Sequence, residues 1–111
     1  MKVRHTKQGS DRELFIIKEK ASRVEILIFK TLPDSLKTNA DIVNGYKNNI
    51  FFAVIKARDL DDKENKGWFG SDMQISKELL ESDNTVGNIW VRWIAAAILK
   101  KRQKHISEQK N

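Results

Sequence analysis

The segment from Asn48 to Leu60 constrains the fold most, because it is apolar on nearly every side. Its central run, IFFAVIKA from Ile50 to Ala57, contains one charged residue. A helix with so few polar positions has to be buried among other elements. One proline and five glycines in 111 residues leave few interruptions, which favours helices over many short strands. The sequence therefore predicts a mainly α domain with a core helix over about 48–60.

The segment that precedes this helix is compatible with two structures. A helix over 22–31 is favoured by a capping box at Ser22 and Glu25. The alternative is a β-hairpin, with ELFIIKE and RVEILIFK as strands that turn at Lys20–Ala21–Ser22, and the β-branched content of both runs supports it. Helical periodicity of 3-4-3-4 is found in the apolar residues Leu14, Ile17, Ala21, Val24 and Ile28.

Further helices are expected at Thr38 to Asn44, over about 72–81 and over about 84–104, the second of them capped by Ser71. The segment from Asp61 to Gly67 is polar and is expected to be a solvated loop. These elements form a single domain of 4–5 helices over residues 11–104. A flexible basic arm, residues 1–10, and a polar tail, residues 105–111, flank the domain.

The residues from Gln74 to Ile89 have the spacing of two short helices that cross at a wide angle. The first helix would turn Ile75 and Leu79 inward and the second would turn Val86 inward, while the small Ser76 allows the helices to approach closely. The pattern Q-I-S-x-x-L-x-x-S-x-x-T-V-x-x-I resembles a helix-turn-helix. The preceding A-R-D…N-K-G-W-F-x-S extends the resemblance to the N-terminal winged-helix domains of phage and plasmid replication or regulatory proteins.

The resemblance covers roughly residues 48–95, with two departures in the turn. Leu80 stands where the family usually has glycine, and Glu81 stands where it usually has an apolar residue. The chain after the second helix is also helical in character, so a β-hairpin wing is not expected there. The resemblance implies binding of double-stranded DNA, in transcription control or in replication or partition of a mobile element.

The charge distribution fits such a partner. Residues 1–10 carry three bases and no acid, and residues 86–111 carry six bases and one acid, out of a net charge of +6. Asn84, Asn88 and Arg92 share one helical face, from which asparagine can read adenine and arginine can read guanine. A basic cluster further along the helix would neutralise phosphates. The candidate DNA-binding residues are Ser82, Asn84, Thr85, Gly87, Asn88, Arg92, Lys100, Lys101, Arg102 and Lys104.

Catalytic chemistry finds no support in the residues. The chain has no cysteine, and its two histidines, His5 and His105, are far apart in the sequence. No phosphate-cradling glycine loop or metal-ligand spacing is present. We therefore expect no enzymatic activity, no catalytic residue, no small-molecule substrate, no cofactor and no metal. The longest apolar run, Ile89 to Leu99, is too short to span a bilayer, and a reducing cytoplasm without membrane contact is expected.

A homodimer is expected, because one recognition helix rarely provides enough contact with DNA. Its interface would use Ile94, Ala97, Ile98 and Ile106 or the apolar face of residues 14–28. Trp90 and Trp93 are expected in the core. The alternative function is a small protein-protein interaction module, an inhibitor or adaptor on a helical scaffold.

Overall fold

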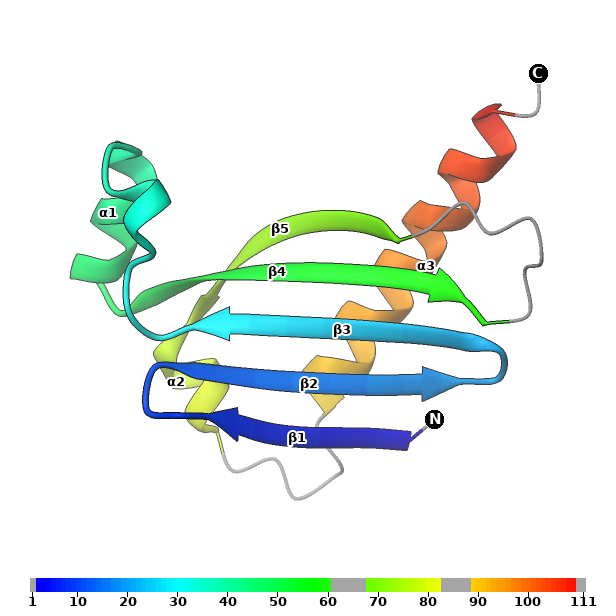
Figure 1. The fold of residues 1–111 in the computed structure, drawn as a ribbon, viewed down its shortest axis with the longest axis horizontal. Helices are drawn as coiled ribbons and strands as arrows, with labels where there is room; N and C mark the ends of the chain where they lie inside the picture. Colours follow the sequence, from blue (N-terminus) through cyan, green and yellow to red (C-terminus); the bar gives the residue numbers. More distant parts are fainter. Residues whose placement is uncertain (1, 61–67, 83–88, 110–111) are drawn as a thin grey trace.

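The chain folds into an antiparallel sheet with one long helix packed across it (Figure 1). The structure is a computed structural model that describes residues 2–60, 68–82 and 89–109. Five strands pair in chain order as a meander, namely β1 (Lys2–Gln8), β2 (Arg12–Glu19), β3 (Ser22–Phe29), β4 (Ile50–Asp59) and β5 (Phe69–Ser76). The helical elements are a 3-10 turn (Asp34–Leu36), α1 (Ala40–Lys47), α2 (Lys77–Glu81) and α3 (Ile89–Gln109).

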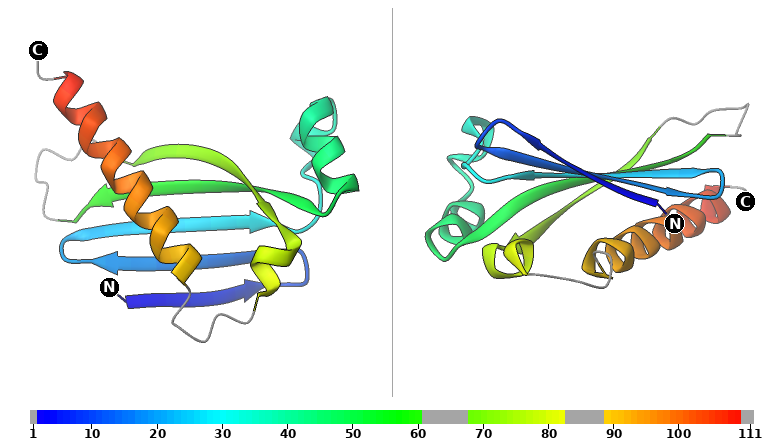
Figure 2. Two further views of the ribbon diagram at one scale, coloured as in Figure 1. Left: turned by 180° about the vertical axis from the view of Figure 1, so that it is seen from behind. Right: turned by 90° about the horizontal axis from the view of Figure 1, so that it is seen from below.

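The two faces of the sheet are covered differently. α3 runs diagonally across one face of the sheet, and α2 lies on the same side, whereas α1 stands at one end of the sheet beside the connection from β3 to β4 (Figure 2). The fold is therefore α+β, with a covered face and an open face. No helix in the described part of the chain is long and apolar enough to cross a membrane.

The prediction of a mainly α helix-turn-helix domain is wrong. The expected core helix over 48–60 is β4, an interior strand between β3 and β5 that is apolar on both of its sides. Phe51, Ala53 and Ile55 face α3 and are buried, while Phe52 and Val54 lie half-buried on the opposite face. A strand that is apolar on both faces lacks the alternation of apolar and polar residues that marks most strands, and its sequence then resembles that of a buried helix.

The expected helix over 22–31 is also wrong, and the alternative hairpin is the structure found. β2 and β3 pair from Arg12↔Phe29 to Glu19↔Ser22, which leaves Lys20 and Ala21 as a two-residue turn. Lys20 has a φ of 52°, a conformation that glycine or asparagine adopts more easily. Residues 2–8, expected in a flexible arm, form β1 along the edge of the sheet.

The segment expected to form the first helix of the helix-turn-helix is mostly a strand. Most of the expected helix over 72–81 is β5, and only its last turn is helical, as α2, which Ser76 caps by accepting a hydrogen bond from the Leu79 N–H. A strand followed by a five-residue helix cannot make the helix pair of the motif. The short helix expected after Thr38 is present as α1. The expected loop from Asp61 to Gly67 lies outside the described residues.

The core is the layer between the sheet and α3. Trp90 is buried there, edge-on to Phe15 with 5.1 Å between ring centroids. Trp93, expected beside it, is instead 72% exposed, because α3 turns Val91, Ala95 and Ile98 toward the sheet and these positions lie half a turn away. Members of this core from all layers are Phe15, Ile17, Val24, Ile26, Ile28, Phe51, Ala53, Ile55, Ala57, Ile75, Trp90, Val91, Ala95 and Ile98.

Of the α3 residues expected at a dimer interface, Ala97 is exposed and Ile106 is half-buried, whereas the other two pack inside the molecule. Ile98 is buried against the sheet, and Ile94 is partly buried beside it. The apolar residues of the segment 14–28 are divided between the two faces of β2 and β3. The single helical face expected from the 3-4-3-4 spacing of this segment is therefore not formed.

The covered face contains a buried carboxylate, that of Glu13. Glu13, on β2, is 6% exposed, and its carboxylate accepts hydrogen bonds from Lys30 at 3.2 Å and from His5 at 2.7 Å. The His5 ring stacks on Phe15 at 4.1 Å between centroids. Burial alone would raise the pKa of the Glu13 carboxyl, but the hydrogen bonds and charges of Lys30 and His5 outweigh it and hold this pKa below its ordinary value of 4.5.

This lowered pKa predicts a dependence of stability on pH. A carboxyl group with a lower pKa in the folded state stabilises the fold above the unfolded pKa, and this stabilisation is lost as the pH falls through the folded pKa. We therefore expect the parent to be more stable than Glu13→Gln at pH 7, with the difference shrinking below pH 4.5. Urea unfolding of both proteins across this pH range measures it. A difference that stays constant down to the acid limit would contradict the assignment.

Candidate nucleic-acid interface

The face of the sheet opposite α3 is the candidate interface, and Figure 1 views the molecule from this side. Among the described residues, no helix lies over it. The strand registers show which side chains share this face, because directly paired residues of antiparallel strands point to the same side. It carries two acidic side chains, Glu25 and Asp72. Seven basic side chains project from it, namely Lys2, Arg4, Arg12, Lys18, Arg23, Lys56 and Arg58.

Four of these cations form one straight line across the sheet. Lys2 pairs with Lys18, Lys18 pairs with Arg23, and Arg23 pairs with Arg58 on four successive strands. We call Lys2, Lys18, Arg23 and Arg58 the basic row. It is about 14 Å long, since neighbouring strands lie about 4.8 Å apart. Like charges directly opposite one another destabilise a sheet, so the row weakens the isolated fold and would be stabilised by an anion.

Only part of this charge is neutralised within the protein. Arg23 Nε donates to Glu25 Oε2 at 2.9 Å. Arg58 Nε is buried and has no hydrogen-bond partner among the described residues. A hollow of about 270 Å³ opens at the β1 end of the row, between Lys2, Arg4, Lys18 and Arg23, with Ile16 and Val3 also in its wall. Four cations around one hollow make a site for an anion.

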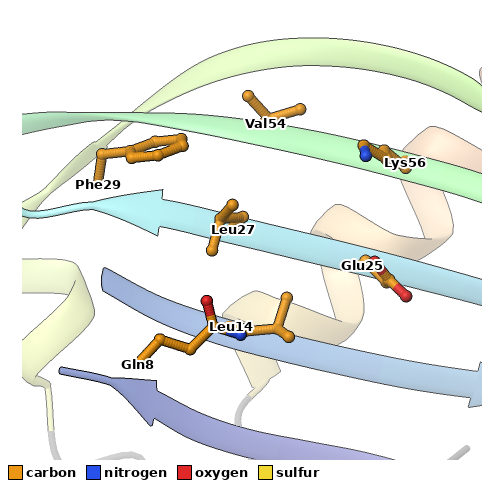
Figure 3. Close-up of a pocket in the computed structure, with 7 residues that line it drawn as sticks. All are labelled: Gln8, Leu14, Glu25, Leu27, Phe29, Val54 and Lys56. Carbon is orange, nitrogen blue, oxygen red and sulfur yellow. The ribbon is translucent and has the colours of Figure 1, made fainter. Parts of the chain in front are cut away.

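A larger hollow, of about 370 Å³, lies next to the basic row in the middle of the open face (Figure 3). Its floor is apolar, with Leu14, Leu27 and Val54 on three neighbouring strands. Glu25 and Lys56, directly paired across β3 and β4, close the end toward the basic row. The other lining residues are Gln8 and Phe29. We call this the central hollow, and its half-buried floor leaves apolar surface for a ligand.

Aromatic rings mark both ends of the open face. Phe29 and Phe52 stack at one end with 6.3 Å between centroids, and Tyr46 of α1 holds both strands there. Its hydroxyl donates to the Phe29 carbonyl at 2.6 Å and accepts from the Phe52 N–H at 3.0 Å. At the other end, the Arg58 guanidinium lies 5.4 Å from the centre of the Trp68 ring. The face thus combines cations, apolar surface and aromatic rings.

The structure disperses the residues that the helix-turn-helix prediction grouped together. Asn84, Thr85, Gly87 and Asn88 lie outside the described residues. Ser82 ends α2, where its hydroxyl donates to the Leu79 carbonyl at 2.7 Å, so it caps a helix end rather than beginning a recognition helix. Arg92 lies half-buried in the first turn of α3.

The predicted basic cluster on α3 is divided. Lys100, Lys101 and Lys104 are exposed, on the helix that covers the face opposite the basic row. Arg102 is 5% exposed, and its Nη1 donates to Asp59 Oδ2 at 2.7 Å. Ser22 donates to the other oxygen of the same carboxylate at 3.0 Å. Arg102 therefore ties α3 to the ends of β3 and β4 and is not placed to contact DNA.

Sequence reasoning missed the basic row completely. Lys2, Lys18, Arg23 and Arg58 have no helical or short-range spacing, and only the registers of three strand pairs bring them together. The signal that could have found them is the hairpin alternative for residues 11–30. With the two-residue turn Lys20–Ala21 that the structure has, in place of the turn Lys20–Ala21–Ser22 that was expected, this hairpin places Lys18 opposite Arg23, two of the four positions.

The open face is the main assembly of polar groups in the described structure. No group of three or more His, Asp or Glu side chains among the described residues is arranged to hold a metal ion. Comparison of the chain with protein-family models, with curated proteins and with solved structures finds no match.

Proposed function

We propose that the protein binds nucleic acid across the open face of its sheet. The observation that carries this proposal is the basic row beside the central hollow. Phosphates of a nucleic-acid strand can follow the row, because each cation that meets a phosphate releases counterions from the strand. Sugars and bases can then contact the apolar floor formed by Leu14, Leu27 and Val54.

A polyanion fits this face better than a second copy of the protein. Two copies joined through their open faces would bring two basic rows toward each other, at a net charge of +6 for each chain. A nucleic acid supplies the opposite charge in a linear array, as the row does. The apolar surface next to the row also favours a ligand with uncharged, flat groups over a simple inorganic anion.

The proposal keeps DNA as a target but changes how it is held. The duplex expectation came from a recognition helix that would enter the major groove, and the helix-turn-helix that would present it is not the structure found. A sheet face can instead lie along a strand and contact its bases, as RNA- and single-strand-binding sheets do with their aromatic side chains. Transcription control and replication of a mobile element remain proposals for its role.

Fluorescence anisotropy of a labelled oligonucleotide at several salt concentrations tests the proposal. If each residue of the basic row neutralises one phosphate of a single strand, the affinity should fall roughly 50-fold between about 50 and 200 mM salt. A chain that binds neither single-stranded nor duplex oligonucleotides at the lower salt concentration would overturn the proposal. That result would favour the alternative function, an inhibitor or adaptor that binds a protein.

A further inference from the structure

We infer that the open face prefers unpaired strands, and that Trp68 provides this preference by stacking on one base. This inference rests on the proposed function and names the form of nucleic acid that is bound. Trp68 immediately precedes β5 and is 38% exposed. Its place at the end of the basic row is shown by the contact of its ring with Arg58.

The backbone around Trp68 holds its ring on the open side. The next residue, Phe69, is paired with Ala57 and points to the covered face, where its ring lies 5.2 Å from that of His105 on α3. Successive side chains of a strand point to opposite faces, so Phe69 anchors the chain while Trp68 is directed the other way. The contact of its ring with Arg58, whose side chain is on the open face, agrees with this direction.

Arg58 joins this ring to the row of cations. Its guanidinium lies 5.4 Å from the centre of the Trp68 ring, and its Nε is buried with no hydrogen-bond partner in the described part of the chain. Arg23 is directly opposite Arg58 on the neighbouring strand. A base stacked on Trp68 would therefore have its phosphate next to two guanidinium groups, the arrangement of ring and cation that single-strand-binding grooves use.

This arrangement discriminates between paired and unpaired strands. A base in a duplex is stacked on its neighbours and paired at its edge, so it cannot reach a ring on the protein without being unstacked. The phosphates of a duplex can still contact the basic row. Stacking on Trp68 thus adds affinity for single strands alone, while the basic row adds affinity for both forms.

Trp93 supplies a matched control. It is the most exposed tryptophan, at 72%, and it lies on α3, on the side of the sheet away from the basic row. If exposed aromatic surface alone mattered, replacing Trp68 or Trp93 would lower the affinity for a single strand equally. A tryptophan that acts by its place at the end of the row would be required only at position 68.

The experiment compares Trp68→Ala and Trp93→Ala in their binding to an oligothymidine and to a duplex of the same length. We expect Trp68→Ala to lose roughly 5- to 150-fold in affinity for the single strand, the range measured when a stacked base is lost. Its duplex affinity should equal that of the parent. Trp93→Ala should bind both forms as the parent does. Trp68→Phe should retain most of the single-strand affinity, because a smaller ring still stacks.

The outcomes separate this inference from the proposed function. If Trp68→Ala folds and binds the single strand as the parent does, with salt-dependent binding intact, the stacking inference is wrong and the proposed function stands. An equal loss for Trp68→Ala and Trp93→Ala would also overturn it. If the parent binds neither form, both the inference and the proposed function fail. Urea unfolding of each variant shows whether a loss of binding comes from loss of structure.

Discussion

Replacing Ile26 by alanine is expected to lower the free energy of unfolding by about 2–5 kcal/mol. Ile26 is 0% exposed in the middle of β3, on the face that α3 covers, and it is paired with Phe15 on one side and Ile55 on the other. Removing three carbons there leaves a cavity that rigid neighbours cannot fill. A domain of this size is stable by about 5–15 kcal/mol, so the loss is a large fraction of the total. Urea unfolding followed by circular dichroism measures it.

Leu27→Ala is the control, because Leu27 is the next residue and faces the open side. It forms part of the floor of the central hollow and is half-buried, so its truncation should reduce stability less than half as much as that of Ile26. Affinity for single-stranded oligonucleotides should instead fall several-fold. If Ile26→Ala and Leu27→Ala lost equal stability, the open face would be as well covered as the face under α3. That result would contradict a free surface for nucleic acid.

The double variant Lys18→Gln, Arg58→Gln is expected to lose on the order of 100-fold in affinity for a single strand, about tenfold for each charged contact. Lys18 and Arg58 alternate with Lys2 and Arg23 along the basic row, so the double substitution leaves no two neighbouring cations in it. Without them, Lys2 and Arg23 no longer face a cation on a neighbouring strand. The salt dependence should weaken as well, from roughly 50-fold to roughly 7-fold between about 50 and 200 mM salt. Stability should be maintained or rise, since like charges that oppose each other are removed.

The matched control for charge is Lys100→Gln, Lys104→Gln on α3. This variant also removes two positive charges, but from exposed positions on the other side of the molecule. We expect its affinity to stay close to that of the parent. If the α3 variant loses binding and the Lys18, Arg58 variant does not, nucleic acid binds to α3, as the sequence first suggested, and the basic row is not the interface.

Two of the expected helices, α1 and α3, are present, whereas the capping boxes at Ser22 and Ser71 predicted helices where the structure has strands. α1 follows a polar cap, where Asn39 Oδ1 accepts from the Ile42 N–H at 3.1 Å, and α3 contains the strong helix-forming run from Ala95 to Leu99. Both elements are specified by residues within one or two turns. The buried position of Trp90 was also predicted, but the same prediction for Trp93 on the same helix is wrong.

The strands could not be predicted in the same way, because their patterns depend on distant partners. β3 and β4 are apolar on the open face as well as the covered one, at Leu27, Phe29, Phe52 and Val54. This removes the alternation that identifies strands. The turn that joins β2 to β3 is Lys20–Ala21, without the asparagine or glycine that usually indicates a hairpin. The apolar residues of the candidate interface are thus the ones that made the strands hard to recognise from the sequence.

The helix-turn-helix resemblance failed for a related reason. The spacing of Ile75, Leu79, Val86 and Ile89 does not depend on the structure of the residues between them. Ile75 is indeed buried, but it is buried as a strand residue paired with Phe51. Leu79, expected inward from the same spacing, is 38% exposed, so the spacing fixed neither the helices nor all of the buried positions.

The position of α3 in the chain has a consequence for synthesis. Each strand of the meander pairs with the strand made just before it, so hydrogen bonding of the sheet can proceed as the polypeptide leaves the ribosome. The helix that covers Phe15, Ile26 and Ile55 is translated after all five strands. Until then the nascent sheet exposes its isoleucine-rich side to water, and this is the interval in which it is most prone to aggregate or to require a chaperone.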